Sequence, residues 1–353
     1  MEIIRDYDLT ARNTFGMKVH CACLVEYDSV VELEKLYAGY LNDFPKPVLH
    51  IGGGSNLLFT KDFPGTVFHS RIRFIEPDFQ STDCFVEVGA GVVFDDFCAW
   101  AAENNLWGAE NLSYIPGETG AAAVQNIGAY GVEVKDIIYK VKCFDAVTGR
   151  MVEFSRDECG YGYRESLFKT DRKGRYVVTS VVFRLHRTPA PVLDYGHIRS
   201  AVEEEAGVSG DELLKVLTPG LVRKVITDVR KTKLPEPSET GSAGSFFKNP
   251  VVPKSAYDKV VSVARLSLVD SCTVPGYDAG SGFVKIPAAW LIEQCGWKGY
   301  IEGNVGVYGK QPLVLVNVTG NASPDEVVAL ERKIIRSVME KFDIQLHPEV
   351  EHV

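Results

Sequence analysis

Residues 115–131 read Ile-Pro-Gly-Glu-Thr-Gly-Ala-Ala-Ala-Val-Gln-Asn-Ile-Gly-Ala-Tyr-Gly and set the character of the whole chain. These 17 residues include four glycines and four alanines. Small side chains bury little apolar area for the backbone entropy that they cost, so the stretch is not expected to be an ordinary core element. Glycine and alanine instead let a flat or polyanionic ligand approach the main chain, whose N–H groups can form an anion-binding concavity. The stretch therefore predicts a site for a bound nucleotide cofactor.

A second glycine-rich turn lies earlier in the chain, at residues 52–56. It follows the strand-like segment 47–51 and reads Gly-Gly-Gly-Ser-Asn. Its glycines offer backbone N–H donors without Cβ obstruction, and its serine and asparagine add side-chain donors. Either stretch alone is more typical of a plain turn. A third block, Gly-Ser-Phe-Phe-Lys-Asn-Pro at residues 244–250, makes coincidence a poor explanation for all three.

The order of the predicted elements favours an α+β fold. A capping box of Ser29 and Glu32 predicts a helix to about Leu41. Apolar spacing predicts strands over 47–51, 84–88 and 176–185, a helix over 94–104, and a β-hairpin of 138–145 with 151–154. This order is not the alternation of a doubly wound sheet. The chain also has neither a Gly-x-Gly-x-x-Gly fingerprint nor a Gly-x(4)-Gly-Lys-Ser/Thr loop, so the common nucleotide folds lose their best signals.

The segment Lys233-Leu234-Pro235-Glu236-Pro237-Ser238 is the best candidate for a domain boundary, because two prolines within three residues break all periodicity. Thr218-Pro219 before it and Ser323-Pro324-Asp325-Glu326 after it predict the starts of helices, and a smaller α+β unit is expected after it. The expected helices lie at residues 201–205, 219–231 and 324–341, and a strand is expected at residues 312–318.

Composition is that of an ordinary globular protein: the 353 residues are 45% hydrophobic and 24% charged. A net charge of -9 argues against a nucleic-acid partner and against attachment to anionic lipid. No run approaches the roughly 18 apolar residues of a membrane span, and the first residues lack the regions of a secretory signal. We therefore expect a cytoplasmic, monomeric protein whose partner is a small molecule.

The eight cysteines predict thiols rather than a disulfide or metal framework. They stand at positions 21, 23, 84, 98, 143, 159, 272 and 295, without a Cys-x-x-Cys pair. The segment His20-Cys21-Ala22-Cys23 could supply metal ligands, but no second cluster with finger spacing follows it. No metal site is expected.

Taken together, the blocks point to a family. The chain resembles the UDP-N-acetylenolpyruvoylglucosamine reductases, flavoenzymes that make UDP-N-acetylmuramate for bacterial peptidoglycan. The matching blocks run in the family's order along nearly the whole chain, at residues 13–16, 53–56, 116–131, 161–166, 244–250 and 348–350. The resemblance implies a two-subdomain FAD-binding fold of the vanillyl-alcohol oxidase type and a smaller C-terminal α+β substrate domain. The implied boundaries are 1–68 and 69–232 for the FAD-binding subdomains and 233–353 for the substrate domain, whose last residues return to the active site.

The implied reaction reduces the vinyl ether carboxylate of UDP-N-acetylglucosamine enolpyruvate. Hydride goes from NADPH to FAD, and from the flavin N5 to the methylene carbon, while a protein acid protonates the carbon that bears the carboxylate. The resemblance implies that Ser245 is the proton donor and that Arg164 holds the substrate carboxylate. It also implies that Glu349 donates to the developing enol if it is neutral in a dry site.

The resemblance further implies two sets of binding residues. The flavin contacts are Gly52, Gly53, Gly54, Ser55, Asn56, Pro116, Gly117, Thr119, Gly120, Ala121, Ala122, Gln125, Asn126, Gly128, Ala129, Tyr130 and Gly131. The substrate contacts are Tyr195, Lys233, Lys248, Asn249, Tyr277 and Gln294, of which the lysines suit the two phosphates. Tyr277 is expected to lie in a flexible loop eight residues before Lys285, and this loop is expected to close over the substrate as a lid.

One residue departs from the family's pattern. Glu118 stands in Pro-Gly-Glu-Thr-Gly, where the family places a small or apolar residue near the flavin. An acid is unfavourable beside a pyrophosphate unless it points away from it. The expected flavin contacts of this turn therefore require the Glu118 side chain to point away from a bound pyrophosphate.

Two other functions stay open. A flavin oxidase or dehydrogenase of the same fold, acting on a hydroxy acid or alcohol, would share the two glycine-rich stretches but has no reason to carry the block 244–250. A sugar-nucleotide sensor without chemistry would keep the pocket but does not need Ser245, Arg164 and Glu349 together. Because the chain has no separate dinucleotide fingerprint, substrate and pyridine nucleotide are expected to take turns at one flavin face, with ping-pong kinetics.

Overall fold

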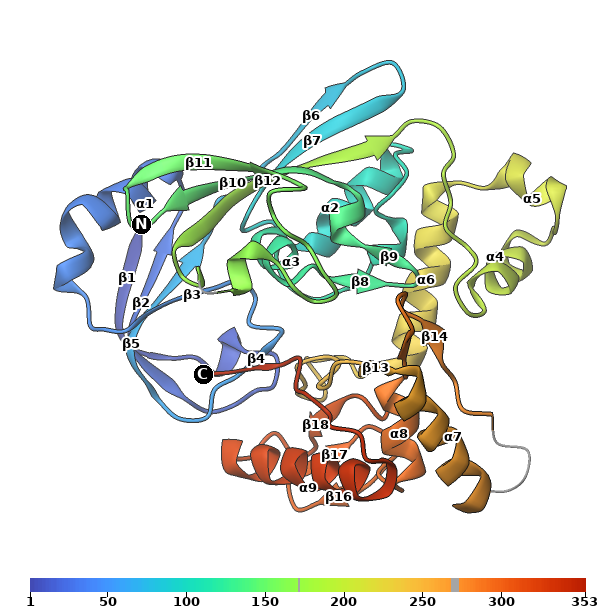
Figure 1. The fold of residues 1–353 in the computed structure, drawn as a ribbon. Coiled ribbons are helices and arrows are strands. Elements are labelled where there is room, and N and C mark those ends of the chain that lie inside the picture. Colours follow the sequence, from blue (N-terminus) through green and yellow to red (C-terminus); the bar gives the residue numbers. More distant parts are fainter. Residues whose placement is uncertain (171, 268–272) are drawn as a thin grey trace. The chain divides into compact units, whose positions relative to one another are not determined.

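The computed structural model describes residues 1–170, 172–267 and 273–353, in two compact units (Figure 1). Unit 1 consists of residues 1–7, 21–53 and 64–232, and unit 2 of residues 8–20, 54–63 and 233–353. Two early segments of the chain thus fold together with the C-terminal third. The glycine-rich turn at residues 52–56 is divided between the units, with residues 52–53 in unit 1 and residues 54–56 in unit 2.

A four-stranded sheet opens unit 1, in the order β1-β2-β5-β3. Its strands are β1 (Glu2–Asp8), β2 (His20–Tyr27), β5 (Phe63–Ser70) and β3 (Val48–Ile51), and β3 runs parallel to β5. Helix α1 (Val30–Lys35) is capped by Ser29, whose hydroxyl accepts a hydrogen bond from the amide of Glu32, so this half of the predicted capping box is confirmed. The Glu32 side chain accepts from the amide of Asp28 instead of that of Ser29. Irregular helical turns then continue to Asp43.

The second sheet of unit 1 has five antiparallel strands in the order β11-β10-β12-β7-β6. They are β6 (Ile75–Phe79), β7 (Asp83–Gly89), β10 (Ile138–Asp145), β11 (Arg150–Ser155) and β12 (Tyr176–His186). The predicted hairpin is confirmed as β10 and β11. Helix α2 (Phe94–Glu103) covers this sheet, and its Phe97 ring stacks on Phe183 of β12 with centroids 4.5 Å apart.

The stretch 115–131 contains a short buried helix, α3 (Thr119–Gln125), which packs against β12 and β7 (Figure 1). Ala122 and Ala123 belong to the large hydrophobic core of unit 1. A Cβ on Gly120 would come within 2.9 Å of the Cβ of Ala90. The expectation that this stretch is not a core element is therefore wrong for α3. Its small side chains let a helix approach the sheet closely, and the stretch ends in a hairpin of β8 (Gly128–Ala129) and β9 (Val132–Glu133).

Three further helices complete unit 1 around a core of their own that includes Trp107 and Leu193. They are α4 (Ile198–Ala206), α5 (Asp211–Val216) and α6 (Pro219–Lys233). The start of α6 is as predicted, because the hydroxyl of Thr218 accepts from the amide of Leu221 at 3.1 Å.

In its described residues, unit 2 contains short strands and three α-helices. One sheet pairs β13 (Val251–Pro253), β15 (Phe283–Lys285) and β14 (Tyr277–Asp278), and another pairs β16 (Ile301–Glu302), β17 (Val305–Val307) and β18 (Leu315–Asn317). A third pairs β4 (Leu57–Leu58) in parallel with β19 (Glu351–His352). The helices are α7 (Lys254–Ser267), α8 (Ala288–Gln294) and α9 (Pro324–Phe342), and the predicted cap of α9 is confirmed by a capping box of Ser323 and Glu326.

Within the described residues, no helix has both the length and the apolar character that a membrane crossing requires. Seven cysteines are free thiols, and all but Cys295 are buried. Cys272 lies outside the described residues. In the same part of the chain, no group of three or more His, Cys, Asp and Glu side chains could hold a metal ion.

Candidate active site

The glycine-rich turn at residues 52–56 begins where β3 ends at Ile51. Gly54 adopts a φ of +65°, and a Cβ at this position would overlap the backbone carbonyl of Arg12. The carbonyl of Gly54 also accepts from the amide of Thr14 at 3.3 Å. Both the positive φ and the close approach require glycine here. The turn is thereby held against the polar-aromatic block 13–16 of unit 2.

A second turn, residues 116–118, faces Gly53 within unit 1. A Cβ on Gly53 would lie 3.4 Å from the Cα of Gly117, so the two glycines let the two backbones approach each other. The carbonyl of Gly117 accepts from the amide of Phe94 at 3.0 Å, which fixes the turn to the start of α2. Gly53 and Pro116 are exposed. Two opposed turns with accessible main chain suit the pyrophosphate and ring of a dinucleotide such as FAD.

Three of the predicted flavin residues use their side chains to brace this region. The Thr119 hydroxyl donates to the carbonyl of Val92 at 3.1 Å. The side-chain amide of Asn126 donates to the carbonyl of Gly162 at 2.7 Å, and the side-chain oxygen of Gln125 accepts from Lys169 at 2.8 Å. These contacts hold α3 and its end in one place in unit 1.

Arg164 is brought to the end of the same stretch by a tight turn. The amide and carbonyl groups of Gly162 and Glu165 bond to each other at 3.0 and 3.1 Å, and Arg164 within the turn has a φ of +56°. Its guanidinium donates to the carbonyls of Asn126 and Gly128, both at 3.1 Å. The predicted catalytic arginine and the predicted flavin residues 125–128 therefore lie together in unit 1.

Tyr130 and Tyr195, predicted to contact flavin and substrate respectively, also lie together in unit 1. Their rings meet edge to face with centroids 6.2 Å apart. Burial raises the pKa of Tyr130, and Arg230 of α6 hydrogen-bonds its phenol. Arg230 also donates to the carbonyl of Tyr114 at 3.0 Å. The sequence analysis missed Arg230, whose one signal is its place on the helix face of the predicted Lys233, three residues on.

Ser245 and Glu349 belong to adjoining backbone segments of unit 2. The amide of Glu349 donates to the carbonyl of Phe246 at 2.8 Å, and the amide of Lys248 donates to the carbonyl of His347 at 2.9 Å. On its other side, Ser245 forms a β-bridge with Val314. The block that carries Ser245 is thus held between two segments, one of which carries Glu349.

The last residues of the chain are anchored rather than frayed. Strand β19 pairs with β4, and the carbonyl of Val353 accepts from the amide of Thr60 at 2.8 Å. The side-chain amide of Asn56 donates to the carbonyl of Glu349 at 3.1 Å. A predicted flavin residue and a predicted catalytic residue are therefore in direct contact in unit 2.

The predicted substrate residues are spread over both units. Lys233 is exposed at the end of α6, and Tyr195 is exposed near the start of α4. In unit 2 the side-chain oxygen of Asn249 accepts from the amide of Ala288 at the start of α8 at 2.9 Å. Gln294 ends the same helix, so the structure does not place it beside Asn249.

Tyr277 lies in a short strand. It is 51% exposed in β14, opposite Lys285 of β15. The expected loop is a hairpin at this tyrosine, because backbone pairing closes it across the turn at Gly280 and Gly282, both with positive φ. Its flexibility stays a prediction. Closure of this hairpin over a substrate stays a prediction.

Glu118 turns inward, away from the exposed side of its turn. Its side chain is 9% exposed, and Oε1 lies 2.9 Å from Nε2 of His69 on β5. The other ring nitrogen of His69 lies 2.7 Å from Oε1 of Glu26 on β2. The unfavourable placement of an acid in the flavin turn is thus avoided. Sequence reasoning missed His69 and Glu26, because no local pattern links two separate strands to residue 118.

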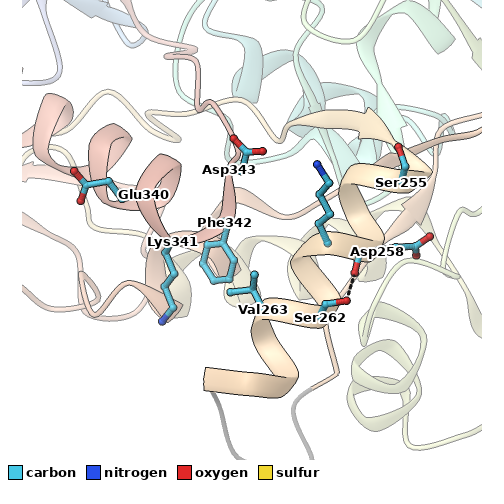
Figure 2. Close-up of a pocket in the computed structure, with 9 residues that line it drawn as sticks. Ser255, Asp258, Ser262, Val263, Glu340, Lys341, Phe342 and Asp343 are labelled. Carbon is cyan, nitrogen blue, oxygen red and sulfur yellow. Dashed lines mark hydrogen bonds between the residues drawn. The ribbon is translucent and has the colours of Figure 1, made fainter.

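A surface hollow of about 480 Å³ lies elsewhere in unit 2, between α7 and the end of α9 (Figure 2). Its lining mixes charges of both signs, including Asp258, Lys259, Glu340 and Lys341. It contains none of the predicted catalytic, flavin or substrate residues. The candidate active site is therefore defined by the turns and segments described above and not by this hollow.

Two protein families match the chain at the level of sequence. The family described as "FAD binding domain" matches residues 21–155, and that described as "UDP-N-acetylenolpyruvoylglucosamine reductase, C-terminal domain" matches residues 236–353. Among curated proteins, the UDP-N-acetylenolpyruvoylglucosamine reductase of Bacteroides fragilis strain YCH46 is 45% identical over 348 residues, which cover 98% of this chain and 99% of the relative. The protein of the same name from Porphyromonas gingivalis strain W83 is 41% identical over 357 residues and the full length of both.

Solved structures share the fold. The UDP-N-acetylenolpyruvylglucosamine reductase of Thermus caldophilus superposes with a TM-score of 0.64 at 22% identity, over 99% of this chain and 98% of that one. The 6-hydroxy-D-nicotine oxidase of Arthrobacter nicotinovorans superposes with a TM-score of 0.54 at 13% identity, over 96% and 86% of the two chains. The predicted fold class, a flavoprotein fold of the vanillyl-alcohol oxidase type followed by a further α+β domain, is confirmed.

Proposed function

This chain belongs to the UDP-N-acetylenolpyruvoylglucosamine reductase family, and from that premise we propose how its own residues carry out the reaction. It is an FAD-dependent oxidoreductase of peptidoglycan precursor synthesis, as the resemblance implied. The proposed reaction reduces UDP-N-acetylglucosamine enolpyruvate to UDP-N-acetylmuramate, with NADPH as the hydride donor, in the cytoplasm and by a monomer. The division of the chain into segments 1–68, 69–232 and 233–353 remains part of the proposal.

The opposed turns at Gly53 and Gly117 support FAD binding in unit 1. Bound FAD supplies the hydride chemistry. The chain's part is to present main-chain N–H groups to the pyrophosphate. Side chains such as Thr119, which hydrogen-bonds the carbonyl of Val92, hold α3 in place beside the turn at residues 116–118. The remaining predicted flavin residues are proposed to contact FAD from the same turns.

Arg164 is proposed to bind the substrate carboxylate and to stabilise the enolate that forms. Its two carbonyl contacts to Asn126 and Gly128 fix the guanidinium plane before substrate arrives. A preorganised cation stabilises developing negative charge without reorganisation during the reaction. A lysine could not reproduce this, because it lacks the planar fork of donors.

Ser245 is proposed to deliver the proton to the carbon that bears the carboxylate. A hydroxyl is a weak acid, but an enolate carbon is a strong base, so the transfer need not be uphill. The serine is held from two sides, by the β-bridge to Val314 and by the hydrogen bond between Phe246 and Glu349. Such bracing favours a single geometry for the proton transfer.

Glu349 is proposed to act as a neutral acid that hydrogen-bonds the developing enol. Its backbone is fixed on both sides: the Glu349 amide donates a hydrogen bond to the carbonyl of Phe246, and the Glu349 carbonyl accepts one from the side-chain amide of Asn56. The observation that carries the proposal is this joining of Glu349 to the residue next to Ser245. Ser245 and Glu349 lie far apart in sequence, and the family resemblance implies a catalytic role for each. One backbone hydrogen-bond pattern joins the two segments that carry them.

Substrate binding is proposed to use Tyr195, Lys233, Lys248, Asn249, Tyr277 and Gln294. The lysines would neutralise the two phosphates, which a chain with a net charge of -9 cannot attract otherwise. Tyr277 is exposed on a short hairpin, and this position is compatible with closure over a ligand. Gln294 is the least supported member, because it lies at the far end of α8 from Asn249.

The test is anaerobic and uses the purified protein with its flavin. NADPH should bleach the flavin absorbance, and UDP-N-acetylglucosamine enolpyruvate should then restore it rapidly. Steady-state kinetics should be ping-pong. Bleaching without restoration by this substrate would instead favour a hydroxy-acid oxidase or dehydrogenase of the same fold, and a protein that binds UDP-sugar but is never reduced would be a sensor.

A further inference from the structure

Unit 1 contains a buried row of three ionisable side chains next to the glycine-rich turn at Gly52. His69 lies between two glutamates: Nδ1 is 2.7 Å from Glu26 Oε1, and Nε2 is 2.9 Å from Glu118 Oε1. The side chains of His69, Glu26 and Glu118 are 1%, 7% and 9% exposed, so water does not separate them. At one end of the row, Glu118 reaches Gly52: a Cβ on that glycine would lie 3.2 Å from Glu118 Oε2.

Counting protons restricts the state of this row. An imidazole nitrogen donates only when it carries a proton, and an ionised carboxylate only accepts. Two hydrogen bonds therefore need two protons among the three side chains. A neutral histidine with two ionised glutamates has only one, which would set a nitrogen lone pair against a buried carboxylate. The row must hold one further proton, whether on the ring or on a glutamate.

The charged groups around the row are consistent with this extra proton. Arg71 donates to the second oxygen of Glu26 at 3.1 Å and is shared with Asp28 and Glu2 at the surface. With the proton present, the row carries one net negative charge, which Arg71 offsets. Tyr27 lies within electrostatic reach of Glu118, but burial raises its pKa far above the ordinary range, so it stays neutral. Loss of the proton would leave an uncompensated charge in the core.

We propose that Glu26, His69 and Glu118 form a hydrogen-bonded network that holds one extra proton and positions residues 52–53 of the proposed FAD site. Glu118 stays in contact with Gly52 only while this proton is present. This inference rests on the proposed role of residues 52–53 and 116–118 in FAD binding. When the network loses its proton, the His69–Glu118 bond breaks, and the freed carboxylate adds negative charge beside the site for the cofactor's pyrophosphate. FAD affinity should then fall, and by reciprocity bound FAD should tighten the hold on the proton.

The experiment measures the Kd of FAD for the refolded or flavin-stripped full chain by flavin fluorescence from pH 6.5 to 9. For the native chain, the Kd should rise with pH by up to about tenfold per pH unit once the proton begins to leave. Independently of FAD, the stability of the stripped chain to urea should fall from about pH 6.5 until the network begins to lose its proton and then level off, because the folded state holds a proton that an unfolded histidine releases above about pH 6.5.

The decisive variant is Glu118→Gln. Its amide can donate to Nε2 of a neutral His69 while Nδ1–H donates to Glu26, so both hydrogen bonds form without the extra proton. It should bind FAD at pH 7 within about threefold of the native chain, lose the pH dependence of the Kd, and lose the part of the alkaline decline in stability that the network causes. Glu76→Gln, an exposed glutamate of β6 in the same unit, is the matched control and should keep both.

His69→Gln has one donor and one acceptor face and cannot serve two carboxylates, so it should bind FAD more weakly at every pH. Combining it with Glu118→Gln supplies the missing donor and should recover part of the affinity, which a merely structural role of residue 69 does not require. A native Kd and stability that are both flat from pH 6.5 to 9, or a Glu118→Gln protein with the native pH profile, would overturn the network. Absence of FAD binding at any pH, with the stability profile as expected, would instead remove the proposed cofactor role of the turns.

Discussion

The backbone amide of Glu349 donates a 2.8 Å hydrogen bond to the carbonyl of Phe246, the residue that follows Ser245. This bond ties the penultimate segment of the chain to the block that carries the proposed proton donor. The tail beyond it is tied in turn to residues 57–60, through β4 and the Thr60 contacts of Val353. The position of Glu349 therefore depends on residues that themselves have no chemical role.

Removal of Glu351, His352 and Val353 should impair the second half-reaction. Without β19, Glu349 keeps its own backbone bonds but loses the strand that aligns it, and a small misplacement of a catalytic group can cost about 100-fold in rate. We expect rapid-mixing experiments to show slow reoxidation by substrate with FAD still bound. His352→Gln, which retains the strand, should reoxidise at a rate close to the native one, and equal loss in both proteins would contradict this account.

Ser245→Ala should separate the two half-reactions. Reduction of the flavin by NADPH should be unchanged, while reoxidation by UDP-N-acetylglucosamine enolpyruvate should slow by about 10² to 10⁴, the usual range for a lost general acid. Ser262→Ala is a suitable control, because this serine lies on α7 of the same unit and donates to the carbonyl of Asp258 within its own helix. Equal slowing of both half-reactions would refute the role of Ser245.

Arg164→Lys should lower the rate of reoxidation by about 100-fold, in the range expected when one preorganised charge-stabilising donor is lost. A lysine cannot donate to the carbonyls of Asn126 and Gly128 and still present two parallel donors to a carboxylate. The Kd of an unreactive substrate analogue should rise as well. Arg156→Lys, at an exposed arginine of unit 1, is the control, and a normal rate in Arg164→Lys would exclude bidentate binding.

His50 should make the protein less stable in acid. Burial lowers its pKa to about 4, so the folded chain resists a proton that the unfolded chain accepts near pH 6.5. Its contribution is complete above pH 6.5 and is lost as the pH falls toward 4, by up to about 3 kcal/mol. His50→Gln, which can still bond the Tyr37 hydroxyl, should flatten urea stability between pH 6.5 and 4.5. The exposed His197→Gln should follow the native curve.

His352 should have the opposite effect on stability. The hydrogen bond to Glu331 at 2.8 Å raises its pKa, so its stabilising contribution is complete below about pH 6.5 and is lost as the pH rises through the folded value. His352→Gln and Glu331→Gln should each remove the same part of the alkaline decline in the unfolding midpoint, separate from the part that Glu118→Gln removes. A decline as steep as the native one in both variants would contradict a contribution from His352.

Local sequence signals predicted the elements whose determinants are close together in the chain. The capping residues Ser29, Thr218 and Ser323 begin helices as expected, and the hairpin of β10 and β11 follows from its own alternation and turn. These features need only neighbouring residues, so the tertiary structure had little to add. The chemistry of Arg164 was indicated by its block but not the two carbonyls that hold it.

Non-local contacts decided the rest. The residues of α3 have a composition that fits a ligand-facing loop, yet they pack on a sheet because Ala90 and β12 happen to leave room for small side chains. Tyr277 forms a strand because Lys285 lies opposite it.

By itself, then, the sequence determined the family, the order of elements and the chemical types available for reduction. Only the tertiary structure decided that Glu118 turns inward to His69 and that Glu349 is bonded to Phe246. The physical reason is that hydrogen bonds and burial depend on distance in space, and these partners come from separate strands, turns and chain ends that no local pattern connects.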